Sequence, residues 1–253
     1  MKTNFSEFSD SQWEGIEKII NDQRKRKHSL RSILNGIFWI NNTGSQWRNL
    51  ESKYPPWQTV FYHFTQLKVR GIWEQLLDFL VVMTREKNGR DASPSLLAID
   101  SQSVKKVQFI SEETGVDGGK NVNGRKRTIL VDKLGLPLAI KVTAANISDN
   151  QAGILTVDLL KGKVPRLQKI AADAGYKKAF CEHVETNYRW EVEIAQKPES
   201  SVGFVPEKNR WQVERSFGWL NFRRRLFRDV EKTILSAEAM LQIAFISFIV
   251  NKL

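Results

Sequence analysis

Two stretches decide the fold class: LLAID at residues 96–100 and TILVDKLGLPLAIKVTA at residues 128–144. The first is a short apolar run that ends in an acid. The second holds two apolar runs, TILVD and LAIKVTA, on either side of the turn KLGLP. Gly and Pro in a short connection between apolar runs favour a hairpin. The sequence therefore predicts a β-strand followed by a β-hairpin.

Helices and strands alternate after this hairpin. Helical periodicity covers residues 149–161, 179–187 and 206–227, while RLQKIAAD (166–173) and WEVEIAQ (190–196) have the pattern of strands. Alternating elements of this kind pack as a sheet with helices on its faces. We expect an α/β fold with a mixed sheet flanked by helices.

The N-terminal part of the chain is helical by its pattern, because apolar residues recur at three- and four-residue spacing from Asp10 to about Arg85. One helix is expected from about Pro56 to Lys68 and another from Gly71 to Thr84. The basic run RKRKH (24–28) can belong to a helix-turn-helix that binds DNA. A plain helical bundle that supports the next domain explains the same pattern equally well.

A polar segment rich in Gly, Pro and Ser, EKNGRDASPS at residues 86–95, has the composition of a linker. We place a domain boundary near residue 92. This predicts a small helical region at residues 1–92, which would bind DNA if it contains a helix-turn-helix, and a second, α/β domain at residues 93–253.

Charge and cysteine content narrow the class of protein. The 39 Lys and Arg residues outnumber the 28 Asp and Glu residues, and the net charge of +11 favours a polyanionic partner such as nucleic acid. A solvated basic surface is the plainer explanation. One cysteine excludes an internal disulfide, and three isolated histidines match no zinc-ligand spacing.

The apolar segments of the chain do not predict a membrane protein. The N-terminus has no apolar signal core, and the run from Ala239 to Val250 is too short to span a bilayer, so we expect it to be a buried helix. A cytoplasmic protein without a membrane partner is the expectation.

Three acids are the candidate catalytic residues. Asp100 and Asp173 end predicted strands, where catalytic groups gather in open sheets, although an Asp there is often only a turn or capping residue. Glu214 lies in a predicted helix, on a stripe with Arg210, Gly218, Asn221 and Arg225, next to an apolar face of Val213, Phe217, Leu220 and Phe227. An ordinary surface ion pair between Arg210 and Glu214 is the alternative.

Three carboxylates supply the hard oxygen ligands that Mg²⁺ prefers and leave coordination positions open for a phosphate and a water. Two such ions can activate a nucleophile and stabilise the leaving oxygen of a phosphodiester. The expected cofactor is therefore a pair of Mg²⁺ ions, with Mn²⁺ as a substitute, held by Asp100, Asp173 and Glu214.

Basic residues surround these acids in the sequence. The segment GVDGGKNVNGRKRTILVD (115–132) in particular has the composition of a flexible cationic loop leading into a strand, or of a solvated basic hairpin. Phosphates of DNA are the expected ligands. The candidate DNA-binding residues are Lys105, Lys106, Lys120, Arg125, Lys126, Arg127, Arg210, Asn221, Arg223, Arg224 and Arg225.

Six ordered segments carry a resemblance to a known family: FSDSQW, KYPPWQTVFYHF, AIDSQSVK, GVDGGKNVNGRKRTILVDKLGLPLAIKVTAANISD, AADAGYKKAF and RWQVERSFGWLNFRRRL. Together they resemble the transposases of the prokaryotic insertion sequences numbered family five. The resemblance runs from Phe8 to the C-terminal apolar segment.

This resemblance implies a ribonuclease-H-like catalytic fold, a triad of two aspartates and one glutamate, Mg²⁺ dependence, and cut-and-paste transposition through terminal inverted repeats. By motif the triad falls on Asp100, Asp173 and Glu214. In the superfamily's C-terminal signature, Arg210 and Glu214 match, but Glu207 replaces the expected Tyr and Asn221 the expected Lys. Arg223 to Arg225 are the natural substitutes for that Lys. Thr128 stands where the family often has His and receives no catalytic role.

The expected function is metal-dependent cleavage and strand transfer at terminal inverted repeats. The partners are double-stranded DNA, both element ends and target, with a homodimer acting on it and no small-molecule substrate. The alternative is an inactive or repurposed DNA-binding protein derived from a transposase. A repair or junction nuclease on the same fold is a further rival, and a basic packaging protein would leave the acids at strand ends unexplained.

Overall fold

The computed structural model describes residues 5–22, 24–195 and 210–251. The chain forms two compact units. The helical unit comprises Met1–Leu80, Leu220–Phe227 and Ala239–Leu253, and the sheet unit comprises Val81–Trp219 and Arg228–Glu238. This division differs from the expected single boundary near residue 92, because two segments late in the sequence belong to the helical unit.

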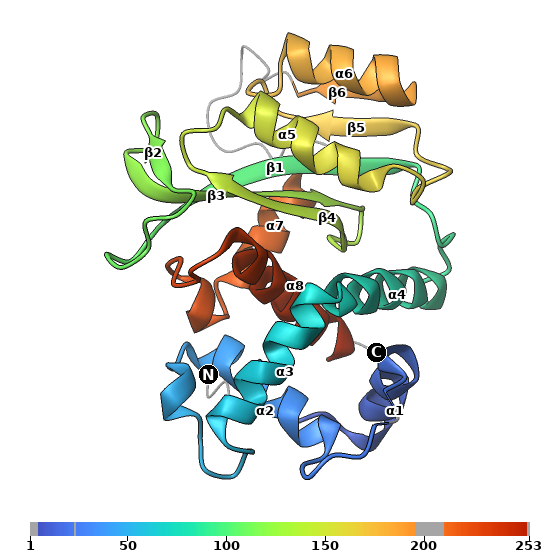
Figure 1. Ribbon diagram of the computed structural model, residues 1–253. Helices are drawn as coiled ribbons and strands as arrows, with labels where there is room; N and C mark the ends of the chain where they lie inside the picture. Colours follow the sequence, from blue (N-terminus) through green and yellow to red (C-terminus); the bar gives the residue numbers. More distant parts are fainter. Residues whose placement is uncertain (1–4, 23, 196–209, 252–253) are drawn as a thin grey trace. The chain divides into compact units, whose positions relative to one another are not determined.

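The N-terminal part of the helical unit consists of short helices, as its periodicity predicts (Figure 1). Ser9 and Ser29 cap two of them by accepting backbone N–H groups. The basic run 24–28 lies between these two helices rather than within one, and Arg24 pairs with Asp22. The elements are α1 (Asp10–Ile20), α2 (Leu30–Thr43), η1 (Trp47–Asn49), α3 (Trp57–Val69) and the start of α4 (Ile72–Lys87).

The C-terminal apolar run forms most of helix α8 (Ile234–Val250). From Ala239 onward nearly every side chain of α8 is buried, which confirms the expected core helix. The side chain of Asn41 in α2 donates to the carbonyl of Met240 at 3.0 Å. No helix within the described ranges is both long enough and apolar enough to cross a membrane.

The sheet unit is built on one mixed sheet, which confirms the predicted strand and hairpin. Strands β1, β5 and β6 are parallel to one another, and β3 pairs antiparallel with β1, β2 and β4. The strands are β1 (Leu96–Lys105), β2 (Gly115–Asp117), β3 (Val122–Val131), β4 (Pro137–Ala144), β5 (Lys169–Ala172) and β6 (Glu191–Ile194).

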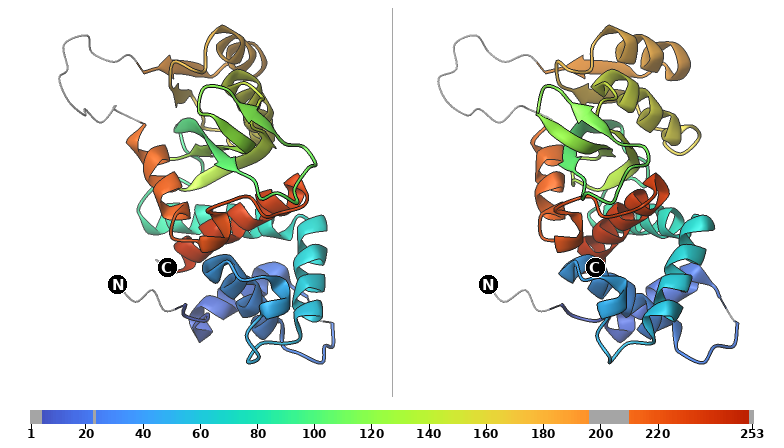
Figure 2. Two further views of the ribbon diagram at one scale, coloured as in Figure 1. Left: turned by 90° about the vertical axis from the view of Figure 1, so that its left-hand side faces the viewer. Right: turned by 60° about the vertical axis from the view of Figure 1, so that its left-hand side comes forward.

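Helices cover both faces of this sheet (Figures 1 and 2). On one face lie α5 (Asp149–Val157), which continues into η2 (Asp158–Leu160), and α6 (Lys178–Tyr188), while α7 (Trp211–Leu220) lies on the other. The apolar core under α5 and α6 comprises Leu97, Ile99, Leu130, Ala139, Val157, Leu160, Val164, Leu167, Ile170, Ala172, Tyr176, Phe180 and Val184.

Candidate active site

The register of two neighbouring strands sets Asp100 beside Asp173. Strand β1 pairs in parallel with β5, with Ala98 opposite Ala171. Carried two residues further, the same register aligns Asp100 with Asp173, and side chains at equal levels of parallel strands point to the same face. Asp100 itself lies inside β1 rather than at its end, because β1 continues to Lys105 along β3.

One guanidinium joins the two aspartates. The Nη2 atom of Arg210, which precedes α7, lies 3.9 Å from Asp100 Oδ2 and 3.6 Å from Asp173 Oδ2. Asp100 is largely buried, and this burial raises the pKa of its carboxyl to about 6. The Ser101 N–H and Arg210 act in the opposite direction on that pKa, and Asp173 adds to the rise.

Within the sheet unit, helix α7 bonds to the β3–β4 turn. Arg215 Nη2 donates to the Leu134 carbonyl at 2.8 Å, and Ser216 Oγ donates to the Gly135 carbonyl at 2.9 Å. Gly135 has a φ of +78°, and a Cβ there would lie 2.8 Å from Ser216 Oγ. The turn that the sequence predicts therefore also positions the helix that carries Glu214.

Glu214 lies in the first turn of α7, four residues after Arg210, and its side chain is exposed. Across residues 5–22, 24–195 and 210–251, no three or more Asp, Glu, His or Cys side chains are close enough together to hold a metal ion. The structure thus brings two of the three predicted acids together. The third, Glu214, lies four residues after Arg210, the residue that contacts both aspartates.

The two aspartates fit a divalent cation. Both offer carboxylate oxygens, the hard ligands that Mg²⁺ and Mn²⁺ prefer, and both already converge on one positive group, the Arg210 guanidinium. Asp100 and Asp173 are partly buried, and a bound cation offsets the repulsion between two neighbouring carboxylates. The donor set is therefore suitable for a metal shared between Asp100 and Asp173.

A further acid near this pair was missed from the sequence. Asp149, the first residue of α5, accepts from Ser101 Oγ and from Lys126 Nζ, both at 2.7 Å. Its carboxyl pKa is lowered: burial acts to raise it, but the hydrogen bonds from Lys126 and Ser101 outweigh that effect. The available signal was an acid at the start of the helix that follows the predicted hairpin.

The second half of the expected flexible loop (115–132) forms a central strand of the sheet. Strand β3 begins at Val122, so Arg125, Lys126 and Arg127 lie in it, between β1 and β4. All three are buried. A strand flanked on both edges and covered on both faces presents no side chain to solvent, whatever its charge.

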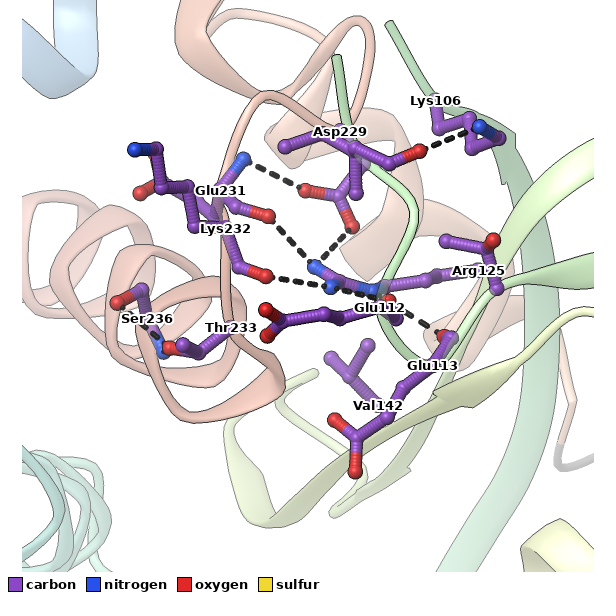
Figure 3. Close-up of polar contacts among 12 residues, drawn as sticks. Lys106, Glu112, Glu113, Arg125, Val142, Asp229, Glu231, Lys232, Thr233 and Ser236 are labelled. Carbon is purple, nitrogen blue, oxygen red and sulfur yellow. Dashed lines mark hydrogen bonds and ion pairs between the residues drawn. The ribbon is translucent and has the colours of Figure 1, made fainter. Parts of the chain in front are cut away.

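Arg125, predicted to contact DNA, lies among polar groups of the protein itself (Figure 3). Its side chain is fully buried, and its Nη1 atom donates to Asp229 Oδ2 at 3.1 Å and to the Glu231 carbonyl at 2.8 Å. Nη2 donates to the carbonyls of Glu112 and Lys232. The prediction that Arg125 contacts DNA is therefore wrong for this structure, because the guanidinium is used inside the protein.

The two residues after Arg125 are also directed inward. Lys126 Nζ bonds Asp149 and the Ile147 carbonyl, each at 2.7 Å. Arg127 points to the opposite face, where burial lowers its pKa to about 10 and the charges of Asp229 and Glu231 act to raise it. Neither cation is available to a phosphate on the protein surface.

Helix α7 ends at Leu220, earlier than the predicted end at residue 227, and residues 206–209 of that prediction lie outside the described part of the chain. The expected stripe therefore stops at Gly218, and neither Asn221 nor Arg225 lies on it. Phe227, expected on the apolar face, is 62% exposed.

The basic run after α7 is mostly buried in the helical unit. Arg223 Nη1 donates to Asn42 Oδ1 and Nη2 to Ser247 Oγ, each at 2.7 Å, and burial lowers the pKa of Arg223 to about 10. Arg225 Nη1 donates to the Ser45 carbonyl at 3.1 Å. Through these bonds Arg223 links α2 to α8, and Arg225 contacts the segment that follows α2.

Four of the predicted DNA-binding residues are exposed, namely Lys105, Lys120, Asn221 and Arg224. Lys120 lies in the turn between β2 and β3, and its charge acts on both Asp100 and Asp149. Lys106 is half-buried, with its ammonium bonded to the Ile110 carbonyl, and Arg210 is buried beside the aspartates. Among these four exposed residues, Lys120 is thus the one whose charge lowers the carboxyl pKa of both Asp100 and Asp149.

Two family models match the chain. Residues 91–249 match the family model "Transposase DDE domain", and residues 8–77 match "Putative transposase of IS4/5 family". No curated protein matches the chain. The DDE domain is ribonuclease-H-like, so the expected fold class is confirmed, and DDE transposases generally use divalent metals. The chain belongs to the DDE transposases of the IS4/5 family.

Proposed function

We propose that this transposase cleaves DNA at the ends of an insertion sequence and joins those ends to target DNA at the site of Asp100, Asp173 and Glu214. The observation that supports the proposal is the convergence of the two aspartates on Arg210. Two carboxylates that share one guanidinium are unfavourable in a purely structural role, because their like charges repel each other and Asp100 is largely buried. A cation-dependent reaction would explain why both aspartates are present at this position.

Each residue has a distinct role in this proposal. Asp100 and Asp173 would hold a divalent cation, and Glu214 would supply a third carboxylate from α7. Two Mg²⁺ ions, or Mn²⁺ in their place, would polarise the phosphodiester and activate a water or a 3′-hydroxyl when bound. Arg210 offsets the charge of the two aspartates and is placed to contact a phosphate there.

Family membership implies binding to the terminal inverted repeats. We assign recognition of the repeats to the helical unit, and nonspecific phosphate contacts to Lys105, Lys120 and Arg224, which are exposed. Joining two element ends to one target requires two active sites, so the proposed active species is a homodimer on DNA.

The test is Mg²⁺-dependent nicking of a labelled duplex that carries the inverted repeats flanking the gene. Asp100→Asn, Asp173→Asn and Glu214→Gln should each abolish nicking and joining while binding to the duplex stays intact. The triple variant should be scarcely worse than any single one, because residues that act as a unit are not additive. Asp158→Asn, which alters an exposed carboxylate at the other end of α5, is the matched control.

Different results contradict different parts of the proposal. Nicking by the wild type without metal would exclude the mechanism. Wild-type nicking by Glu214→Gln would remove that residue from the site. Specific binding to the repeats without any cleavage, under all metal conditions, would favour a repurposed DNA-binding protein.

A further inference from the structure

The first two residues of α5 each reach one of the two aspartates through an intermediate residue. Asp149 Oδ1 accepts from Ser101 Oγ at 2.7 Å, and the backbone N–H of Ser101 donates to Asp100 Oδ1 at 2.7 Å. Asp149 and Asp100 therefore lie on opposite faces of β1, because successive side chains of a strand alternate. Ser101 is buried and connects the two.

The second connection leads to Asp173. The side-chain amide of Asn150 donates to the Gly175 carbonyl at 3.0 Å, and the Gly175 N–H donates to Asp173 Oδ1 at 2.8 Å. A Cβ at Gly175 would lie 2.9 Å from Asp173 Oδ1 and 3.2 Å from Asp149 Oδ2. A side chain at this position would therefore displace one or both carboxylates.

The start of α5 is itself held in place. Lys126 Nζ, from the middle of β3, forms an ion pair with Asp149 and also donates to the carbonyl of Ile147. Ser148 caps the helix by accepting the Gln151 N–H at 3.2 Å. A carboxylate at a helix N-terminus is favoured by the helix dipole. The donor network therefore fixes Asp149 and Asn150 relative to β3.

We propose that Asp149 and Asn150 are positioning residues that set the separation of Asp100 and Asp173, and with it the affinity of the site for a divalent cation. This inference rests on the proposed function of the site. The two aspartates repel each other before a cation binds, and α5 holds the segments that carry them against that repulsion. Loss of residues that orient metal ligands typically weakens metal affinity by about 10- to 100-fold.

The variants that separate this role from folding are Ser101→Ala and Asn150→Ala. Each removes one connection and leaves the Lys126–Asp149 ion pair intact. Asp149→Asn removes the charge as well and is the stronger but less conservative change. The matched control is again Asp158→Asn, because Asp158 directly follows the far end of α5 and its carboxylate bonds His183 and Tyr188.

The measurement is Mn²⁺ binding to the full-length protein, by calorimetry or by the loss of the free Mn²⁺ electron paramagnetic resonance signal. Ser101→Ala and Asn150→Ala should each weaken Mn²⁺ affinity by about 10-fold or more. The Mn²⁺ concentration for half-maximal nicking should rise by the same factor, while the rate at saturating Mn²⁺ changes little. Asp158→Asn should match the wild type, and the thermal midpoints should show that all four proteins are folded.

Two negative results are distinguishable. If the wild type binds Mn²⁺, Asp100→Asn abolishes that binding, and Ser101→Ala and Asn150→Ala bind like Asp158→Asn, the positioning role is overturned and the proposed site stands. If Asp100→Asn binds Mn²⁺ and nicks DNA as the wild type does, the proposed function itself fails, and the positioning role fails with it.

Discussion

Among the single residues of the proposed site, Asp100 has a carboxyl whose ionised form is destabilised by the fold. Burial raises the pKa of this carboxyl from 3.8 to about 6, and Asp173 adds to the rise, so the ionised form is disfavoured in the folded chain. The charge of Arg210 offsets part of this destabilisation by lowering the pKa of Asp100. A residue that costs stability when charged is typical of sites kept for function.

We therefore expect Asp100→Asn to stabilise the protein in the absence of divalent metal. The pKa of the Asp100 carboxyl is higher in the folded chain than in the unfolded chain. The stability that the protonated carboxyl contributes is therefore fully present below pH 4, and it is lost as the pH rises through about 6 and the buried carboxyl ionises. At pH 7.5 the gain should be on the order of 2 kcal/mol in the free energy of unfolding, and it should disappear near pH 4.

Urea unfolding with a chelator present, at pH 4 and at pH 7.5, measures this difference. Asp158→Asn removes an exposed carboxylate and should show no comparable gain. An equal effect of Asp100→Asn at both pH values would contradict the electrostatic explanation and indicate a change in packing instead.

Among the elements, the β3–β4 turn has two functions. It closes the hairpin, with Asp132 Oδ1 accepting the N–H groups of Leu134 and Leu136 at 2.9 Å each, and it anchors α7 through Leu134 and Gly135. Asp132 is also paired with Arg85 in the interior. A buried pair of this kind is costly to break from one side, by about 3–5 kcal/mol, which keeps the turn in one conformation.

Gly135→Ala and Gly162→Ala test this anchoring as a matched pair. Both glycines have positive φ, +78° and +76°, so both alanines should lose about 1–2 kcal/mol from backbone strain. Only at Gly135 does the added Cβ meet α7, 2.8 Å from Ser216 Oγ, whereas Gly162 has no atom within 4 Å.

Gly135→Ala should therefore lose roughly 1–3 kcal/mol more than Gly162→Ala from overpacking. It should also reduce metal-dependent nicking, because α7 carries Glu214 and follows Arg210. Urea unfolding and the nicking rate give the two readouts. Equal stability and equal activity of the two variants would show that the turn does not position α7.

For the whole molecule, the excess of basic residues is not a count of DNA contacts. The net charge is +11, but Arg125, Lys126, Arg127, Arg223 and Arg225 are buried and bonded within the protein. Their charge still contributes to the long-range attraction of DNA, while direct phosphate contacts depend on exposed cations. The surface contacts are accordingly fewer than the composition implies.

Salt dependence of DNA binding separates these two contributions. Lys105→Gln with Lys120→Gln should weaken binding to all sequences alike and reduce the slope of log affinity against log salt by about 0.9 for each lost contact. Lys133→Gln with Lys161→Gln removes the same charge. Both control residues are exposed and lie in other segments, Lys133 between β3 and β4 and Lys161 directly after η2.

A filter-binding or fluorescence titration over a series of salt concentrations measures the slope. The control pair should leave it nearly unchanged. Equal slopes for both pairs would mean that Lys105 and Lys120 act only through net charge.

Local patterns in the sequence were sufficient for the kind and order of the elements. Apolar periodicity and turn residues predicted β1, the β3–β4 hairpin, α3 and the buried C-terminal helix, because these signals reflect hydrogen bonds and packing within a few residues. The motifs around Asp100, Asp173 and Glu214 likewise predicted the family, since the order of motifs along the chain needs no knowledge of the fold.

The tertiary structure alone decided which side chains meet and which face solvent. The parallel register of β1 and β5 sets Asp100 beside Asp173, and the pairing of β3 on both edges turns a predicted cationic loop into a buried strand. Asp149 bonds Ser101 of β1 and Lys126 of β3 only because the fold brings the start of α5 to these strands. These are contacts between residues far apart in the chain, so no local periodicity or charge pattern records them.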